Sequence, residues 1–344
     1  KAGPAAGAAD TRTFEWRLVT TWPANFPGLG TGAIDFAKRV EACSAGRLKI
    51  RIYGDGELVP AFETFDAVSS GTAEMGHGAS YYWKGKVPAA SFFASVPFGL
   101  VAQEMNAWLY NGGGLALWQE AYAPFGLLPV PCGSSGTQMG GWFRKEIGSV
   151  DDLKGLKFRI GGMGGQVFAR LGAVPQQIAP GDIYPALERG TIDAAEFVGP
   201  YDDEKLGFYK VAKNYYFPGW WEGSAMLHLC INLEKWNALP KHYQSLVRQA
   251  CDAANTWMLA KYDAVNAAAL KRLIGNGVVL KPFPMPVMEA CYKATNEQFA
   301  EIAGKDAHFK KALDSMNAFR REQLPWWQIA EYAFDSFMIS TRRV

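Results

Sequence analysis

Arg159 is the residue whose type and position suggest the most specific chemistry. It lies at the end of an apolar segment that is typical of a strand, and a glycine-rich run at residues 161–165 follows it. Open α/β sheets bind ligands beyond the carboxyl ends of their strands, so an arginine here is directed toward a binding crevice. Its planar guanidinium can hold a carboxylate through two parallel hydrogen bonds. A structural ion pair is the alternative interpretation.

Glu196 and Glu222 are two acidic residues that could act as a pair. Paired carboxylates are typical of enzymes that cleave glycosidic bonds, where the distance between the carboxyl groups decides the reaction. The sequence does not fix that distance. The alternative is structural: Glu196 would support the fold near a domain crossing, and Glu222, between Trp221 and Gly223, would be a solvated loop charge.

Other familiar chemical motifs are missing from the sequence. The run at residues 161–165 precedes a predicted helix, but it matches neither GxGxxG nor GxxxxGK[ST]. The four histidines are scattered, and the five cysteines form no CxxC pair and no zinc-like cluster. We therefore expect buried free thiols and no nucleotide site.

The composition of the 344 residues limits the class of protein. Lys and Arg number 35 and Asp and Glu 33, and a net charge of +2 argues against a nucleic-acid partner. With 49% hydrophobic and 20% charged residues, the chain is globular and long enough for about two domains. No apolar run is long enough to span a membrane. The first ten residues are small, as expected at the start of an exported chain whose signal peptide has been removed.

Hydrophobic periodicity predicts two α/β units followed by long helices. The first unit should contain strands at residues 14–20 and 48–53, a helix at 34–40, a helical segment at 101–118 and a strand at 127–130. Residues 133–136 are the best linker candidate. The second unit should contain a strand ending near residue 160, helices after 161–165 and at 183–187, and a strand at 191–198.

The remaining chain is predicted to be helical. A long helix should run over residues 243–273 and end at Asn276 and Gly277. The C-terminal segment carries an aromatic stripe that includes Trp326, Phe334 and Phe337. Its own fold or a partner subunit must cover so much apolar surface.

Several segments together resemble the solute-binding proteins of TRAP transporters, the tripartite ATP-independent periplasmic transporters of the DctP type. These segments are residues 152–159, 190–196 and 236–240, with Gln244 and Leu246. The resemblance covers nearly the whole chain from Phe14. A second set is more similar to the TakP-like subgroup, which binds 2-oxo acids: residues 21–23, 27–30, 65–71, 81–86, 96–99 and 138–142.

This resemblance implies an α/β, two-lobe periplasmic binding protein fold with an interdomain cleft, crossing strands and long C-terminal helices. Lobe I would comprise residues 14–135 and 223–264, and lobe II residues 136–222 and 265–318. Residues 319–344 would form a C-terminal helix that exchanges between the subunits of a homodimer, with packing on its own chain as the alternative. The lobes would close on the ligand by a hinge motion.

The resemblance also implies a binding site. Arg159 would hold the carboxylate of the ligand. A cation, Na⁺ or Ca²⁺, would bridge protein and ligand through the side-chain oxygen of Gln138, the main-chain carbonyl of Phe197 and the carboxylate of Glu222. Such oxygen donors suit hard cations.

Two further features of the site follow from the resemblance. Tyr81 and Tyr82 match aromatic residues near the ligand, without an indication of which one points inward. Phe197 stands where the resemblance leads us to expect Trp, and Gly223 where it leads us to expect Pro. The pocket wall and the loop around Glu222 are therefore expected to differ from those of the subgroup.

The implied function is that of a periplasmic substrate-binding protein, which is not an enzyme. It would capture a pyruvate-like 2-oxo acid or a lactate-like 2-hydroxy acid with its cation and deliver it to a TRAP membrane permease. Two alternatives stay open: an exported hydrolase that uses Glu196 and Glu222, and a binder of the same fold for a C4-dicarboxylate or an aromatic acid. The sequence decides neither the preferred acid nor the cation.

Overall fold

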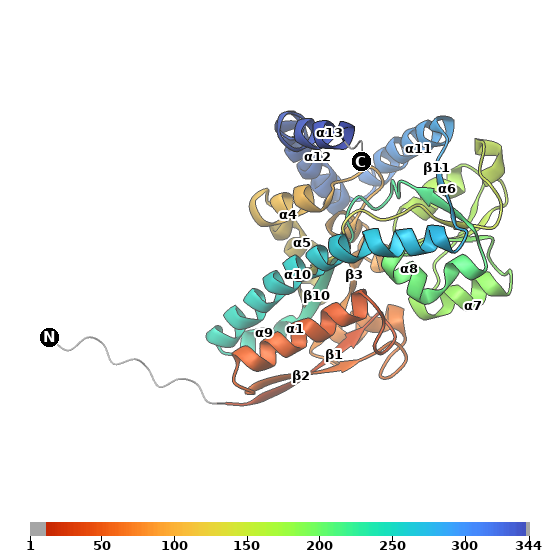
Figure 1. Ribbon diagram of the computed structural model, residues 1–344. Helices are drawn as coiled ribbons and strands as arrows, with labels where there is room; N and C mark the ends of the chain where they lie inside the picture. The colour runs from red at the N-terminus through yellow and green to blue at the C-terminus, as the bar shows by residue number, and fades with distance from the viewer. Residues whose placement is uncertain (1–11, 342–344) are drawn as a thin grey trace.

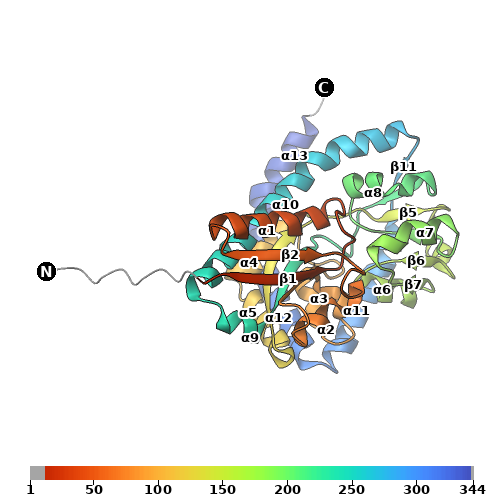
Figure 2. The ribbon, with the colours of Figure 1, turned by 90° about the horizontal axis from the view of Figure 1, so that it is seen from below.

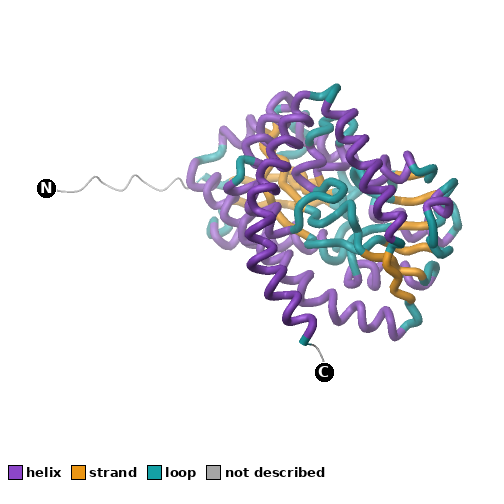
Figure 3. Tube along the Cα trace, turned by 90° about the horizontal axis from the view of Figure 1, so that it is seen from above, coloured by secondary structure: helices purple, strands orange, loops and turns teal. Residues whose placement is uncertain are grey.

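Two β-sheets organise the chain, and the computed structural model describes residues 12–341 of it. Figure 2 shows the sheets side by side, with β1 and β2 in one lobe and β5, β6 and β7 in the other. Helices surround both groups of strands (Figure 3). This arrangement confirms the predicted α/β class. The first ten residues, which we predicted to begin an exported chain, lie outside the described residues.

The sheet of lobe I has the strand order β2-β1-β3-β10-β4. Its first three strands are parallel, as βαβ units require, and β10 runs antiparallel to both β3 and β4. The strands are β1 (Phe14–Thr20), β2 (Leu48–Tyr53), β3 (Met75–Ala79), β4 (Leu127–Ser134) and β10 (Met226–Asn232). The alternating segments 14–20 and 48–53 are thus strands, as predicted.

The sheet of lobe II has the order β11-β9-β5-β8-β6-β7. Strands β6, β7 and β8 run parallel to one another, and β5 is antiparallel to its neighbours β8 and β9. The strands are β5 (Gly141–Phe143), β6 (Lys157–Arg159), β7 (Val174–Gln176), β8 (Ala194–Ala195), β9 (Asn214–Phe217) and β11 (Val279–Pro282).

Helices cover both sheets (Figure 1). Those of lobe I are α1 (Leu29–Cys43), α2 (Thr64–Ser69), α3 (Ala90–Ala94), α4 (Ala102–Asn111), α5 (Gly114–Tyr122) and α9 (Leu233–Ala238). Those of lobe II are α6 (Gly164–Arg170), α7 (Ile183–Glu188), α8 (Pro200–Leu206) and α11 (Met285–Ala303). The long helix α10 (Lys241–Gly275) packs on α1 and β4 in lobe I and on α8 in lobe II, so it joins the lobes.

The chain ends in α12 (Ala307–Trp327), a turn of π-helix (Gln328–Tyr332) and α13 (Ala333–Ser340). The first half of α12 is packed through Phe309, Ala312 and Met316. The last helix, α13, extends beyond the rest of the fold toward the C-terminus (Figures 2 and 3). Among residues 12–341, none of the helices combines the length and hydropathy needed to cross a membrane.

Two local predictions were wrong, those for residues 101–118 and for residues 191–198. Residues 101–118 are two helices, because Gly113 adopts a φ of 88°, which separates α4 from α5. The linker candidate at residues 133–136 does lead from the first sheet to the second: β4 ends at Ser134, β5 belongs to the other sheet, and all four residues are buried. The strand expected at residues 191–198 is only Ala194–Ala195. The cysteines are free thiols, and all but Cys43 are buried.

Candidate functional site

Arg159 and Glu196 meet at the carboxyl edge of the lobe II sheet. Arg159 is the last residue of β6, and Glu196 directly follows β8. These strands are parallel neighbours, with Arg159 opposite Ala195. Parallel pairing therefore places both side chains at the edge where α/β sheets bind ligands.

The guanidinium of Arg159 is held by groups of its own lobe. Its Nη1 donates to Oε1 of Glu196 at 2.6 Å and to the main-chain carbonyl of Glu196 at 2.7 Å, and its Nε donates to the Ile178 carbonyl at 3.2 Å. Arg159 and Glu196 are only 2% and 1% exposed. The structural ion pair is thus present, and Arg159 also lies near enough to Tyr82 to lower the pKa of its hydroxyl, against the opposing effect of burial.

Gln138 and Glu222 lie on the two segments that cross between the lobes. Gln138 stands between β4 and β5, and Glu222 between β9 and β10. The crossings are hydrogen-bonded to each other, since the Gln138 amide donates to the Glu222 carbonyl at 3.0 Å. Glu222 is only 2% exposed, so the interpretation as a solvated loop charge was wrong.

Oxygen atoms of Gln138, Phe197 and Glu222 converge on one point. The side-chain oxygen of Gln138 faces the Phe197 carbonyl at 2.5 Å and also Oε2 of Glu222, while its amide nitrogen donates to Ser135 Oγ at 3.0 Å. Acceptor oxygens this close repel unless a positive group lies among them. A 180° rotation of the amide would also relieve the repulsion, since its NH₂ would then donate to both oxygens.

These residues fit a hard cation. Amide, carbonyl and carboxylate oxygens are the donors that Na⁺ and Ca²⁺ prefer. Oε1 of Glu222 is buried and has no hydrogen-bond partner, which a cation would provide. Within residues 12–341 there is no cluster of three or more His, Cys, Asp or Glu side chains that could hold a metal ion. The converging set differs from such a cluster because it draws on an amide and a main-chain carbonyl.

The electrostatics of the site also call for a positive partner. Burial, and then the nearby Glu196 carboxylate, raise the pKa of Glu222 well above its usual value. Burial raises the pKa of Tyr82 to about 12, although Arg159 opposes this shift, so Tyr82 remains a neutral hydrogen-bond donor. A buried carboxylate such as Glu222 is costly to ionise without compensation.

Lobe I closes over this group from the opposite side. Tyr81 and Tyr82 follow β3 in a short 3₁₀ helix, Ser80–Trp83, and both are buried. Tyr81 packs on lobe II so closely that a Cβ built on Gly161 would lie 3.2 Å from its ring. The Tyr82 carbonyl accepts a hydrogen bond from Gln177 at 3.3 Å. The structure is therefore the closed arrangement of the two lobes.

Aromatic rings complete the wall of the site. Phe26, which follows β1, packs edge-on against Phe197 with ring centres 5.6 Å apart, so the contact crosses from one lobe to the other. The guanidinium carbon of Arg159 lies 5.6 Å from the centre of the Phe197 ring. Sequence reasoning missed Phe26, because nothing in its local pattern shows that it faces a residue so distant in the chain.

The pair of glutamates does not have the geometry of a glycosidase. The Glu196 carboxyl group lies close enough to Glu222 to raise the pKa of Glu222. Retaining and inverting enzymes separate theirs by about 5 Å or more, to leave space for the sugar or a water molecule. Glu196 is also occupied by Arg159 and by the Gly161 amide at 2.7 Å. The arrangement favours binding over hydrolysis.

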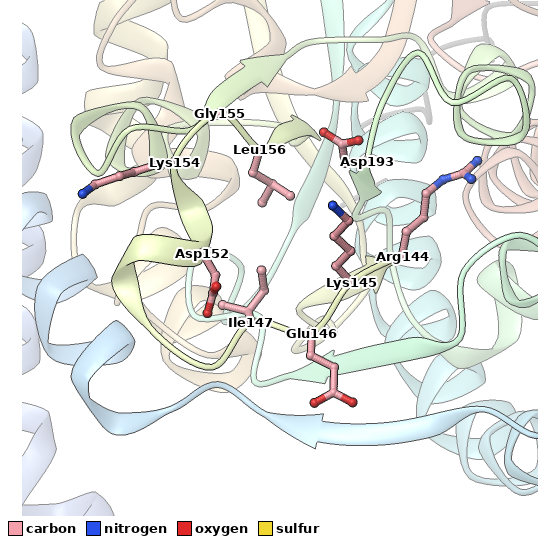
Figure 4. Close-up of a pocket in the computed structure, with 9 residues that line it drawn as sticks. All are labelled: Arg144, Lys145, Glu146, Ile147, Asp152, Lys154, Gly155, Leu156 and Asp193. Atoms are coloured by element: carbon pink, nitrogen blue, oxygen red, sulfur yellow. The ribbon is translucent and has the colours of Figure 1, made fainter.

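A surface pocket of about 250 Å³ lies elsewhere on lobe II (Figure 4). Its lining includes Asp193 and residues of the connection between β5 and β6, such as Arg144 and Asp152. Asp193 precedes β8, so this pocket is at the amino edge of the parallel strands, opposite Arg159 and Glu196. Sequence reasoning did not identify it, and it shares no residue with the predicted site.

Comparisons with known proteins agree with this geometry. The model of bacterial extracellular solute-binding proteins, family 7 (DctP), matches residues 18–306. A monocarboxylate 2-oxoacid-binding periplasmic protein of Nostoc sp. (strain PCC 7120) is 50% identical, covering 95% of this chain and 90% of the relative.

Two solved structures share the whole fold. A TRAP transporter solute-binding protein from Bordetella bronchiseptica, a mixed-occupancy dimer with calcium and picolinate in one active site, is 46% identical with a TM-score of 0.94, covering 96% of this chain and 98% of that one. A TRAP periplasmic solute-binding protein from Pseudoalteromonas atlantica, with sodium and pyruvate, is 43% identical with a TM-score of 0.92, covering 94% and 99%. The predicted two-lobe fold is thereby confirmed.

Proposed function

We propose that this chain, which belongs to the DctP family of bacterial extracellular solute-binding proteins, is the binding component of a TRAP transporter for a small 2-oxo or 2-hydroxy monocarboxylate. The observation that carries this proposal is the convergence of the Gln138, Phe197 and Glu222 oxygens beside the Arg159 guanidinium, inside the closed interface between lobes. A bound Na⁺ or Ca²⁺ would attract one carboxylate oxygen and the C2 oxygen of the acid. The likeness to the Nostoc protein supports the same substrate class.

Each residue of the site has a distinct role in this proposal. Arg159 holds the carboxylate of the acid, and Tyr82 donates its hydroxyl proton from the opposite lobe. Gln138, Phe197 and Glu222 hold the cation. Tyr81 covers the site from lobe I and lies within hydrogen-bonding reach of Glu222. Because the groups come from both lobes and from the crossings, the acid is bound only when the lobes close.

The arrangement predicts selectivity for acids with an oxygen on C2. A plain monocarboxylate such as propionate lacks that oxygen and leaves the cation short of one donor. A C4-dicarboxylate would bring a second negative charge into an apolar wall formed by Phe26 and Phe197. An aromatic acid with a donor atom next to its carboxylate has suitable chemistry, as the picolinate in the Bordetella structure illustrates.

Isothermal titration calorimetry tests this function. The protein is unfolded, dialysed against chelator, refolded and titrated with pyruvate, lactate, propionate and succinate in buffer with Ca²⁺ or Na⁺. Pyruvate or lactate should bind at least about tenfold more tightly than propionate, the equivalent of one lost oxygen contact. Equal binding of pyruvate and propionate, or stronger binding of succinate, would contradict the proposed substrate class.

The location and the partner follow from the family. Members are extracytoplasmic, and we propose that this chain works in the periplasm and delivers its acid to TRAP permease subunits in the membrane. We also propose the division into lobes at residues 135 and 222, which is supported by the crossings of the chain between the two sheets near Ser135 and Ala225. Release of the acid then requires only that the lobes separate.

We propose that a second copy of the chain covers the C-terminal helix. Apolar side chains are exposed along its outer half, namely Leu324, Trp326, Ile329, Tyr332, Phe334, Phe337, Met338 and Ile339. So large an apolar patch is typical of an interface. The Bordetella structure is described as a dimer. Sedimentation of Phe334→Glu should give a monomer if this surface forms the dimer, and an unchanged mass would contradict it.

A further inference from the structure

Gln177 of lobe II contacts lobe I through both ends of its side-chain amide. Its Nε2 donates to the main-chain carbonyl of Tyr82 at 3.3 Å, and its Oε1 accepts from Nζ of Lys84 at 3.1 Å. Tyr82 belongs to the 3₁₀ helix Ser80–Trp83 of lobe I, and Lys84 directly follows this helix. A donor meets an acceptor at each end, so the amide fits its two partners in one orientation only. We call this pair of hydrogen bonds the Gln177 bridge.

The Gln177 bridge starts beside the residue that holds Arg159. Gln177 directly follows β7, and the carbonyl of the next residue, Ile178, accepts from Arg159 Nε at 3.2 Å. β7 also pairs with β6, whose last residue is Arg159. One turn of lobe II therefore orients the arginine and binds the Tyr82 segment of lobe I. Tyr82 cannot move away from this turn unless the Gln177 bridge breaks.

The Gln177 bridge lies at the surface, where the two lobes meet. A pocket of about 150 Å³ beside it is lined by Lys84 from lobe I and, among others, by Gly162, Pro175 and Gln177 from lobe II. Gln177 is exposed, whereas Tyr82 is buried. The Gln177 side chain is therefore outside the buried site, and its substitution should not disturb the core of either lobe.

The position of β7 in its sheet makes the bridge sensitive to opening of the lobes. The chain crosses between the lobes before β5 and after β9, and β7 is the edge strand, three strands from β5. At about 4.8 Å per strand, Gln177 is roughly 14 Å from the first crossing. A hinge rotation of about 10° then moves Gln177 by roughly 2 Å, which is more than a hydrogen bond tolerates. The Gln177 bridge therefore belongs to the closed arrangement.

On the basis of the function proposed above, we propose that Gln177 is a positioning residue, which holds the lobes closed on the acid and so sets the time that the acid stays bound. It acts through Tyr82 and Lys84, from outside the site of Arg159 and Glu222. A contact that forms after the acid has entered slows its release and leaves its entry into the open protein unchanged. Such a contact affects different acids alike, because it lies outside the site that distinguishes them.

The variant Gln177→Ala tests this role. Stopped-flow tryptophan fluorescence at saturating Ca²⁺ measures the association and dissociation rates of pyruvate and of lactate, and calorimetry checks their ratio. The dissociation rate should rise about fivefold, as expected for the loss of partly exposed hydrogen bonds, and the association rate should stay within about twofold. Both acids should show the same factors. An unchanged dissociation rate, an effect carried by association instead, or different factors for the two acids would overturn the role of Gln177.

Lys84→Met tests one of the two hydrogen bonds by itself. Methionine keeps an apolar side chain at this position and removes the ammonium group, so pyruvate should dissociate about twofold faster. In Gln177→Ala the acceptor for Lys84 is already absent, and adding Lys84→Met should therefore cause no further acceleration. If the two effects multiplied in the double variant, Lys84 would act independently of Gln177, and the bridge would be overturned.

Lys86→Met is the matched control. Lys86 lies two residues after Lys84, but its Nζ donates to Asp66 at 2.7 Å, and both residues belong to lobe I. Loss of this pair should leave both rates for pyruvate unchanged. An acceleration as large as that of Lys84→Met would overturn the link to lobe closure. Failure of the wild-type protein to bind any 2-oxo acid would instead overturn the proposed function.

Discussion

Two buried carboxylates of this protein, Asp203 and Glu222, differ in what surrounds them. Oδ2 of Asp203 accepts hydrogen bonds from the Tyr215 hydroxyl at 2.7 Å and the Trp142 indole at 3.0 Å. Glu222 instead faces the side-chain amide of Gln138 through Oε2 and has an unpartnered Oε1. Both are almost fully buried. In contrast to Asp203, neither of whose oxygens is unpartnered, Glu222 keeps one buried oxygen without a hydrogen-bond partner and so calls for a partner from outside its own chain.

The difference arises from the positions of the two acids in the fold. Asp203 lies in α8, where rings from β5 and β9 of the same lobe supply its donors. Glu222 lies on a crossing, where lobe I, lobe II and the second crossing meet. A residue at such a junction can change its surroundings when the lobes move, and a residue inside one lobe cannot. Glu222 therefore requires a cation in its closed surroundings, whereas Asp203 does not.

Removal of the cation should have the largest effect. With chelator and without Na⁺, the oxygens of Gln138, Phe197 and Glu222 are left uncompensated, so the affinity for pyruvate should fall by roughly 100-fold or more. Calorimetry measures the affinity, and circular dichroism should show that the fold is retained, because Asp203 and its donors are unaffected. Unchanged pyruvate binding in cation-free buffer would remove the distinction between the two acids.

The substitution Arg159→Lys should have the next largest effect. Lysine cannot reproduce the planar guanidinium that contacts Glu196, the Ile178 carbonyl and the acid together. The affinity for the acid should fall by about 1.5–3 kcal/mol, which is roughly 10- to 150-fold. Calorimetry at fixed Ca²⁺ measures this loss. Arg17→Lys, at the Glu74 pair in lobe I, is the control and should bind the acid normally.

The elements of this fold could be predicted from sequence more fully than the contacts of its site. Alternating residues identified β1 and β2, and helical spacing identified α10, because these signals are local. The position of Arg159 at a strand end was also a local signal. Its pairing with Glu196 was not, because it depends on the parallel register of β6 and β8, which sequence periodicity does not reveal.

The same limit explains the errors. Residues 133–136 were predicted as a linker from their small side chains and do connect the two sheets, but the sequence did not show that this linker is buried: a Cβ built on Gly133 would lie 2.8 Å from Met258. Glu222 was open to a solvated interpretation because the burial of its loop is set by the other crossing. The oxygens of Gln138, Phe197 and Glu222 were linked only through family resemblance, since three chain segments must fold before they meet.

Asp203→Asn tests the structural role of the second buried acid. Burial raises the pKa of Asp203 from 3.8 to about 7, so folding favours its protonated form. Its contribution to stability is therefore greatest at low pH and is lost as the pH rises toward 7, at about 1.4 kcal/mol per pH unit. Asparagine does not titrate, so denaturation midpoints measured between pH 5 and 7 should fall less steeply with pH in the variant than in the wild type.

Two controls accompany this prediction. Asp66→Asn changes an exposed acid that pairs with Lys86, and it should leave the pH slope as it is. A smaller slope should remain in Asp203→Asn, because burial also raises the pKa of Asp202 to about 7. Acid binding should change far less than in Arg159→Lys, since Asp203 reaches the site only through one long hydrogen bond, which its Oδ1 accepts from the Val198 amide at 3.4 Å, in the peptide group of the Phe197 carbonyl. An affinity loss as large as that of Arg159→Lys would show that Asp203 is not merely structural.

The smallest expected effects come from the two neighbouring tyrosines, whose rings lie 5.1 Å apart. The Tyr82 hydroxyl is within reach of Arg159, and that of Tyr81 is within reach of Glu222. Each Phe substitution removes one hydrogen bond, worth about 1 kcal/mol or roughly a fivefold change in affinity.

The two variants should nevertheless differ: Tyr82→Phe should change the affinity for pyruvate, and Tyr81→Phe the affinity for the cation. Tyr82→Phe should weaken pyruvate binding equally in Ca²⁺ and in Na⁺, because Tyr82 acts beside the guanidinium. Tyr81→Phe should instead change the cation concentration needed for half-maximal binding, because Tyr81 contacts the acid that holds the cation. Calorimetric titrations at several cation concentrations separate the two effects. If both variants showed the same cation dependence, the site would respond as a single unit, and the separate roles of Arg159 and Glu222 would be wrong.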